Sequence, residues 1–283
     1  MSDSEAFPII ASVSSYETVL VEREEGVAWV TLNRPEKRNA MNPTMHYEML
    51  EVLDELEFDP ETKVLVLTGA GEAWCAGQDL KESFRDLWDK PAELKRSGWA
   101  AQEWRWRRLY HFPKPTIAMV NGYCFGGGFT QLIACDIALA AEEATFGLSE
   151  VNWGTFPAGL VSRVLADAIS YRDAMYYVLT GDTFDGKAAA AMRLVTFAYP
   201  LAELRERTSG LARKLIEKNP NTLTACKDAV KNSAKMDYAL AEQYFAARSQ
   251  ALRAVDPDAR REGIQQFLDG KYKPGFGAYN RDG

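Results

Sequence analysis

Histidine and cysteine are scarce in this 283-residue sequence. The two histidines, His46 and His111, lie far apart, and there is no HExxH motif. The four cysteines show no CxxC spacing. Protein metal sites favour clusters of these two residue types, so we expect no catalytic metal. Cysteines scattered through apolar segments indicate reduced thiols in the core, which are typical of a cytoplasmic protein.

Two further absences concern the surface. Acidic residues outnumber basic ones by 40 to 33, a net charge of −7, so an extended nucleic-acid-binding surface is not expected. No apolar run approaches the roughly 20 residues that cross a bilayer. Residues 1–15 are rich in serine and acidic side chains and lack the basic flank and apolar stretch of a secretory signal. We expect them to form a loose tail, and we expect no membrane as a partner.

Strands and helices alternate through most of the chain. Short β-rich runs are predicted at 18–23, 27–32, 63–67, 116–120, 136–140, 144–147 and 194–198. Helices are predicted after Asn42, which is suited to cap the first one, within 81–112, and over 159–179, 187–192, 204–218, 220–234, 238–254 and 257–268. The recurrence of strand, strand, helix predicts an α/β fold of stacked ββα turns over 16–200. A helical region over 201–283 follows it.

Three consecutive glycines, 126–128, stand between an apolar strand and an apolar helical run. The first N–H groups of a helix have no internal partner, and glycine lets a ligand oxygen approach them closely. Glu150 follows in a largely apolar segment, where we expect a buried carboxyl with a raised pKa. Backbone donors and one carboxylate together suit the activation of a carbonyl group. The alternatives are close helix–strand packing for the glycines and a surface carboxylate for Glu150.

A second glycine-containing loop precedes Gln78. It begins with GAG at 69–71, but Trp74 occupies the place of the third glycine of a dinucleotide fingerprint and no P-loop lysine follows. Nucleotide binding is therefore not expected. Gly77 permits a tight turn, and Asp79 is suited to cap a following helix. The functional alternative is that the N–H of Gln78 is free and forms a second oxyanion donor.

Three segments in this order resemble the crotonase (enoyl-CoA hydratase/isomerase) superfamily. They are LNRPEKRNA at 32–40, AGQDL at 76–80 and NGYCFGGGF at 121–129, and the resemblance covers nearly the whole chain. Within the superfamily, the segments 74–82, 118–125 and 144–154 most resemble the hydroxycinnamoyl-CoA (feruloyl-CoA) hydratase-lyases. The resemblance implies a crotonase-like spiral of ββα units with a C-terminal helical trimerisation region. It also implies a homotrimer or a dimer of trimers.

The resemblance assigns roles to the catalytic groups. It makes the N–H groups of Gln78 and Gly127 the oxyanion hole and Glu150 the acid/base. Enoyl-CoA hydratases usually carry a second glutamate where this chain has Thr130, and the hydratase-lyases commonly have serine there. By the same resemblance, Trp153 shapes the pocket for the aryl group.

The substrate-contacting positions depart in part from the family pattern. The hydratase-lyases carry a tyrosine where this chain has Ser83 and a second one that aligns with Ala246, and both hold the para-hydroxyl of the substrate ring. Tyr238, Tyr244 or a group from the tryptophan-rich segment 81–112 would replace them here. For coenzyme A, the resemblance points to Lys37, Arg38, Ala40 and Ala76, and to Phe267 and Lys271 for CoA bound to a neighbouring subunit.

The resemblance implies a hydratase-lyase that acts on hydroxycinnamoyl-CoA thioesters such as feruloyl-, p-coumaroyl- and caffeoyl-CoA. Hydration of the double bond and retro-aldol cleavage would yield an aromatic aldehyde of the vanillin type and acetyl-CoA. Coenzyme A is part of the substrate, and no further cofactor is implied. Three alternatives stay open: a hydratase or isomerase of another enoyl-CoA without C–C cleavage, a CoA thioester hydrolase or decarboxylase, and a non-catalytic acyl-CoA-binding subunit.

Overall fold

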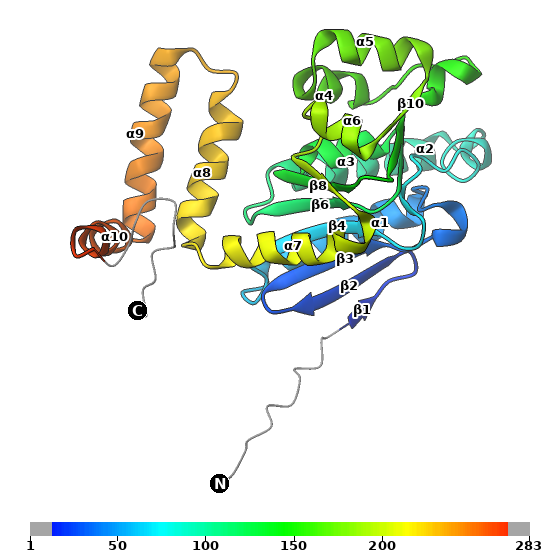
Figure 1. Ribbon diagram of the computed structural model, residues 1–283. Helices are drawn as coiled ribbons and strands as arrows, with labels where there is room; N and C mark the ends of the chain where they lie inside the picture. The colour runs from blue at the N-terminus through cyan, green and yellow to red at the C-terminus, as the bar shows by residue number, and fades with distance from the viewer. Residues whose placement is uncertain (1–12, 271–283) are drawn as a thin grey trace.

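The computed structural model describes residues 13–270, which fold around a seven-stranded sheet (Figure 1). Its strand order is β1-β2-β3-β4-β6-β8-β11. The strands are β1 (Val13–Ser15), β2 (Val19–Glu24), β3 (Val27–Leu32), β4 (Val64–Gly69), β6 (Thr116–Val120), β8 (Ile137–Ala141) and β11 (Phe197–Tyr199). The first three pair antiparallel and the others parallel. The β2–β3 hairpin turns at Glu25 and Gly26, which both have positive φ angles.

A smaller sheet of four short strands carries the loops that matter for function. Its order is β10-β9-β7-β5. These strands are β5 (Ala73–Cys75), β7 (Tyr123–Phe125), β9 (Thr145–Gly147) and β10 (Thr183–Asp185). The chain passes from β4 to β5, from β6 to β7 and from β8 to β9, so each turn of the chain places one strand in each sheet. This winding confirms the predicted α/β spiral.

Helix α1 (Pro43–Phe58) begins as predicted. The Asn42 side chain accepts a hydrogen bond from Met45 N at 2.9 Å, and Pro43 occupies the first turn, where no N–H is required. The apolar face of α1 is fully buried in the core and consists of Met45, Met49, Val52, Leu53 and Leu56. Complete burial of each such side chain contributes about 1.5–3 kcal/mol to stability.

The segment 81–112 is helical, as predicted. It contains η2 (Arg85–Leu87), α2 (Pro91–Gln102) and η3 (Glu103–Arg108), and η3 is a π-helical continuation of α2. Both α2 and η3 pack against α1. Trp104 in η3 is fully buried, whereas Trp88 and Trp99 are exposed. The tryptophans of this segment therefore do not share one role.

The prediction differs from the structure in three details, two of them in the second half of the spiral. The helices there are α3 (Gly128–Ala134), α4 (Val161–Ala168), α5 (Tyr171–Thr180) and α6 (Gly186–Ala191). The predicted helical region 159–179 is two helices, because the Ser170 side chain accepts from Asp173 N and caps a second one. The last strand begins at Phe197, after the buried Leu194. Asp79 accepts from two backbone N–H groups of an irregular turn and not from a helix.

From Leu201 to the end of the described residues at Gly270 the chain is helical, as predicted. The helices are α7 (Leu201–Ile216), α8 (Pro220–Ser233), α9 (Tyr238–Val255) and α10 (Ala259–Leu268). α7 packs on the large sheet, and α8 and α9 stand side by side away from it (Figure 1). The amines of Lys227 and Lys231 on α8 lie 2.8 and 2.6 Å from carboxylate oxygens of Asp136, beside β8. These ion pairs fasten α8 to the body of the molecule.

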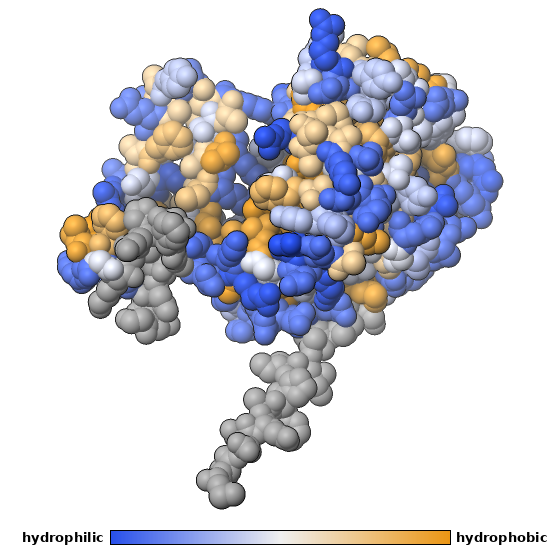
Figure 2. All heavy atoms as spheres, viewed as in Figure 1, coloured by the Kyte–Doolittle hydropathy of each residue, from blue (hydrophilic) through white to orange (hydrophobic). Residues whose placement is uncertain are grey.

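Apolar side chains remain exposed on this helical region. Figure 2 shows orange patches on its surface. The exposed apolar residues of α8, α9 and α10 include Val230, Leu240, Phe245, Val255, Ile264 and Leu268. Large exposed apolar surfaces commonly mark contacts with other chains.

Several expectations concern the chain ends and the cysteines. Strand β1 lies within the segment expected to be a loose tail, and residues 1–12 lie outside the described residues. Cys75, Cys124 and Cys135 are buried free thiols, but Cys226 is exposed, so its predicted core position is wrong.

Across residues 13–270, no helix has both the length and the apolar character that crossing a membrane requires. The same residues contain no cluster of three or more potential metal-binding side chains.

Candidate active site

A cavity of about 630 Å³ lies between the loops that follow β5, β7 and β9 and the helical segment that ends in η3. The loops contribute 76–78, 125–127 and 149–150 to its lining, and the helical segment contributes Leu80, Phe84, Trp88, Gln102 and Arg105. Glu150 is the one carboxylate among the lining residues. The predicted catalytic residues Gln78, Gly127 and Glu150 therefore meet in one place.

Gly77 brings two of these loops together. Its φ angle is +92°, and a Cβ at this position would lie 2.9 Å from Phe125 O and 3.3 Å from Gly127 N. The Gln78 loop is also bridged to Met41, whose N–H donates to Gly77 O and whose carbonyl accepts from Asp79 N, both at 2.8 Å. Within the described part of the chain, neither the Gln78 N–H nor the Gly127 N–H has an acceptor. Two free amide donors thus line the cavity.

Glu150 lies in η4 (Ser149–Trp153), directly after β9. Its Oε2 is buried and finds no hydrogen-bond partner among residues 13–270. Burial raises the pKa of this carboxyl above its usual value of 4.5, because desolvation disfavours the charged form. A carboxyl with a raised pKa is a stronger base when ionised, and it can accept a proton and then donate it in turn.

The outer part of the cavity is aromatic. Phe84, Trp88, Trp153 and Phe156 belong to its lining, and each is at least 43% exposed, so these rings surround the mouth. Trp153 was predicted to lie there. Phe84, Trp88 and Phe156 were not singled out, although the aromatic composition of 81–112 was a signal for the first two. The rings provide an apolar, flat-sided entrance that suits an aryl group.

A cluster of buried polar side chains contacts the two residues that carry the amide donors. His46 Nε2 is 3.0 Å from Gln78 Oε1, and His46 Nδ1 accepts from Trp104 Nε1 at 2.9 Å. Burial, and then the positive charge of Arg105, lower the pKa of His46 to about 3, so the ring is neutral. Arg105 Nη1 donates to Gly127 O at 3.3 Å, and burial lowers the pKa of Arg105 to about 10. No local motif marks His46 or Arg105, and sequence analysis did not select them for the site.

Comparison with known proteins agrees with this geometry. Residues 22–278 match the family model described as enoyl-CoA hydratase/isomerase. This chain belongs to that family. Hydroxycinnamoyl-CoA hydratase-lyase of Pseudomonas fluorescens is 52% identical over 276 residues, which cover 95% of this chain and 100% of that protein. The 2,3-dehydroadipyl-CoA hydratase of Escherichia coli (strain K12) is 32% identical over 91% of this chain and 98% of its own length.

The fold of this family member is also shared with solved structures. The crystal structure of enoyl-CoA hydratase from Bacillus anthracis has a TM-score of 0.79 with 28% sequence identity. The alignment covers 92% of this chain and 96% of that one. Both the predicted family and the predicted crotonase-like fold are confirmed.

In this member of the family, four predicted substrate contacts do not line the cavity of their own chain. Ser83 is buried, and its Oγ donates to Met41 O at 3.1 Å. Thr130 is buried within α3, and its Oγ1 has no partner among the described residues. Tyr238 is 96% exposed on α9, and the hydroxyl of Tyr244 accepts a hydrogen bond from α8.

Of the predicted CoA contacts in and near η1 (Pro35–Lys37), one belongs to the cavity lining. Ala76 lines it, and its N–H donates to Arg38 O at 2.9 Å. The Arg38 side chain is exposed and lies 2.8 Å from a carboxylate oxygen of Glu72. Lys37 is exposed beside it, and Ala40 O accepts from a buried arginine. Two exposed basic side chains therefore lie on the loop whose backbone is bonded to the cavity-lining Ala76.

The other predicted CoA contacts belong to the end of the chain. Phe267 lies on α10, is 47% exposed and does not line the cavity. Lys271 lies outside the described residues. The family resemblance assigns both residues to a neighbouring subunit's CoA, so their position away from the cavity of their own chain does not conflict with that role.

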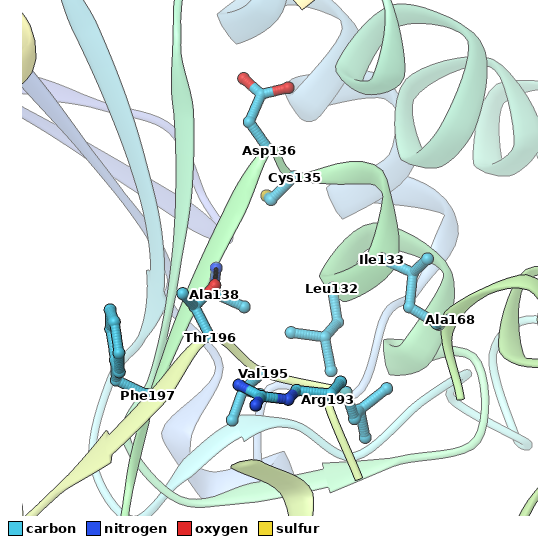
Figure 3. Close-up of a pocket in the computed structure, with 11 residues that line it drawn as sticks. Leu132, Ile133, Cys135, Asp136, Ala138, Ala168, Arg193, Val195, Thr196 and Phe197 are labelled. Carbon is cyan, nitrogen blue, oxygen red and sulfur yellow. Dashed lines mark hydrogen bonds between the residues drawn. The ribbon is translucent and has the colours of Figure 1, made fainter. Parts of the chain in front are cut away.

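A second cavity, of about 380 Å³, lies between α3, β8 and the segment before β11 (Figure 3). Its one carboxylate, Asp136, points away from the other labelled side chains (Figure 3). That carboxylate accepts from Thr116 N at 2.8 Å and is paired with Lys227 and Lys231. With its acid held in structural contacts, this cavity does not offer the acid/base chemistry of the first.

Proposed function

We propose that this chain is a hydratase-lyase that acts on hydroxycinnamoyl-CoA thioesters. The observation that carries the proposal is one cavity with two free amide donors and a single carboxylate. The 52% identity to the Pseudomonas fluorescens enzyme over nearly the whole chain supports the same reaction. The products would be an aromatic aldehyde, vanillin in the case of feruloyl-CoA, and acetyl-CoA.

Hydration uses all three groups. The thioester carbonyl binds between the N–H groups of Gln78 and Gly127. The Glu150 carboxylate takes a proton from water as the oxygen adds to Cβ, and the electron pair of the double bond moves toward the carbonyl. The two donors stabilise the resulting enolate. Glu150 then returns the proton to Cα and is again a carboxylate.

Cleavage uses the same groups a second time. The Glu150 carboxylate removes the proton of the new β-hydroxyl, and the Cα–Cβ bond breaks to release the aldehyde. The electron pair of that bond forms the enolate of acetyl-CoA in the same oxyanion hole. Protonation of its Cα by Glu150 completes acetyl-CoA. One carboxylate suffices because it alternates between base and acid.

Recognition of the ring rests on the wall of the cavity. Trp153 and the other aromatic residues at the mouth suit the faces of an aryl group. Gln102, on α2, also lines the cavity, and an amide both donates and accepts hydrogen bonds. We propose that Gln102 takes the place of the tyrosines that hold the para-hydroxyl in the hydratase-lyases that this chain resembles.

Assembly and CoA binding are part of the same proposal. We propose a homotrimer or a dimer of trimers in the cytoplasm, joined through the exposed apolar side chains of α9 and α10. Lys37 and Arg38 would hold CoA phosphates. Contacts with the substrate bound to a neighbouring subunit would come from Tyr238, Tyr244, Phe267 and Lys271. Light scattering after size exclusion tests the assembly. A mass near the 31.6 kDa of one chain would contradict it.

A hydratase of another enoyl-CoA, without C–C cleavage, is the second candidate. It is favoured by Ser83, whose hydroxyl is bonded to Met41 O and not available to a ring. Incubation with feruloyl-CoA, unsubstituted cinnamoyl-CoA and crotonyl-CoA separates the candidates. Aldehyde from feruloyl-CoA supports the lyase, and hydration alone supports the hydratase. Release of free CoA without aldehyde would indicate a hydrolase, and binding without turnover would indicate a non-catalytic subunit.

A further inference from the structure

The π-helical segment η3 carries two adjacent buried side chains, Trp104 and Arg105, that face the cavity loops. π-Helical turns are rare and occur frequently at functional sites, where the wider turn changes the direction of the side chains. Trp104 does not line the cavity, so it has no direct contact to make in the proposed reaction. Each of the two side chains is connected by hydrogen bonds to a residue that carries one of the two amide donors.

Trp104 reaches the first donor through His46. An indole N–H only donates, so His46 Nδ1, 2.9 Å from Trp104 Nε1, must be the acceptor. A neutral imidazole then carries its proton on Nε2, which donates to Gln78 Oε1 at 3.0 Å. Trp104 and His46 are at most 1% exposed. The Gln78 side chain is therefore anchored in the core while its backbone N–H stays free.

Arg105 reaches the second donor directly. Its Nε donates to Ala101 O at 2.8 Å, and its Nη1 donates to Gly127 O at 3.3 Å. A Cβ on Gly127 would lie 3.0 Å from Nη1, so the guanidinium packs against the residue itself. Within residues 13–270, Arg105 forms no ion pair with a carboxylate. A buried charge bonded to two carbonyls on different segments ties η3 to the glycine loop.

We infer that η3 positions both halves of the oxyanion hole, Trp104 through His46 and Gln78, and Arg105 through Gly127. This inference rests on the proposed function. Two backbone donors stabilise an enolate only if their directions are held during the reaction. A shift of about 1 Å in such a group can lower the rate by about 100-fold. Trp104, His46 and Arg105 are positioning residues, since none of them needs to touch the substrate.

The test measures polarisation of the bound carbonyl without turnover. Glu150→Gln blocks the reaction, and cinnamoyl-CoA labelled with ¹³C at the thioester carbonyl is bound to it. Infrared difference spectra give the carbonyl stretch, which a working oxyanion hole moves to lower frequency. Adding His46→Leu or Arg105→Met should move the stretch back toward that of the free thioester. Adding Trp99→Phe or Arg107→Met should not move the stretch, because neither side chain lines the cavity. Trp99 is exposed, and the exposed Arg107 is paired with Glu103.

Kinetics provide the second measurement. In the chain with Glu150 intact, His46→Leu and Arg105→Met should each lower kcat about 10- to 100-fold with little change in KM, because donors aligned for the transition state act on kcat. If His46→Leu does not fold, Gln78→Met removes the same side-chain bond at a residue that lines the cavity. Arg105→Lys keeps the charge but shortens the reach to Gly127, so it should recover only part of the rate.

The outcomes separate the two proposals. If folded His46→Leu, Gln78→Met and Arg105→Met leave the carbonyl stretch and kcat unchanged, the positioning role is wrong and the oxyanion hole stands without it. If Glu150→Gln alone binds cinnamoyl-CoA with no shift of the stretch, the oxyanion hole itself is wrong, and the inference fails with it.

Discussion

Glu150 Oε1 lies so close to Gly126 that a Cβ on residue 126 would stand 2.8 Å from it. Gly126 has a φ angle of +47°, a conformation that side chains rarely adopt. The glycine thus serves two purposes, the turn that presents the Gly127 N–H and the space for the carboxylate. The donor and the acid/base are brought together at this one residue.

The first prediction concerns the carboxylate. Glu150→Ala should fold normally and lose both hydration and cleavage, with rates lower by at least about 100-fold, because no other carboxylate lines the cavity. Aldehyde release and loss of the enoyl absorbance are measured separately on feruloyl-CoA. A purified, folded variant that keeps either activity would contradict the role of Glu150.

The second prediction concerns the first donor. Gln78→Pro removes the backbone N–H and should lower kcat about 100- to 1,000-fold, whereas Gln78→Ala keeps it and should lose far less. The loss in Gln78→Ala reports the missing bond to His46. Circular dichroism and thermal unfolding establish that both variants fold. Equal losses in two folded variants would count against an oxyanion role.

The third prediction is a dependence of stability on pH. Folded Glu150 holds its proton to higher pH than the unfolded chain does, because burial raises its pKa above 4.5. Between 4.5 and the raised pKa, the folded state binds more protons, so the free energy of unfolding falls as pH rises. The neutral amide of Glu150→Gln does not titrate, so this variant does not lose stability in this way. It should be more stable than the parent chain at neutral pH.

This difference should shrink as the pH is lowered through the raised pKa, since both chains then carry a neutral group at residue 150. Urea unfolding of the two chains across this range measures it. A constant difference at all pH values would mean that the pKa of Glu150 is not raised. Lys187→Met is a suitable control, because its exposed amine is fully charged throughout the range.

The fourth prediction concerns the ring. If Gln102 holds the para-hydroxyl, Gln102→Leu should raise KM for feruloyl-CoA about 10-fold, the loss of one hydrogen bond. Its KM for unsubstituted cinnamoyl-CoA should stay near that of the parent. Glu103→Leu, at the neighbouring exposed ion pair, is the control. Equal effects on both substrates would show that Gln102 does not recognise the hydroxyl.

Much of the fold follows from local sequence signals. The runs 27–32 and 116–120 are strands β3 and β6 with the predicted bounds. Asn42 caps α1 as expected, since an amide followed by proline is a strong start signal. The short strands β5, β7 and β10 were not predicted. Three residues are too few for a periodic pattern, and their pairing depends on strands distant in the chain.

In the candidate site, too, some residues were identified from local sequence signals and the placement of others was not. Gln78, Gly127 and Glu150 were selected from glycine turns and from one carboxylate in an apolar segment, and all three line the cavity. Ser83 and Thr130 were selected by family position, and the structure buries both away from it. A family position specifies where a residue lies along the backbone, whereas the direction of a side chain depends on its neighbours in the core.

The sequence by itself determined the spiral of ββα turns, the two glycine loops and the single acid, because turn chemistry and apolar periodicity act over a few residues. Only the tertiary structure decided which N–H groups remain free and what holds them. The His46–Gln78 bond joins residues 32 positions apart, and the Trp104–His46 bond joins residues 58 positions apart. Contacts at such separations depend on how helices and loops pack, and no local pattern encodes them.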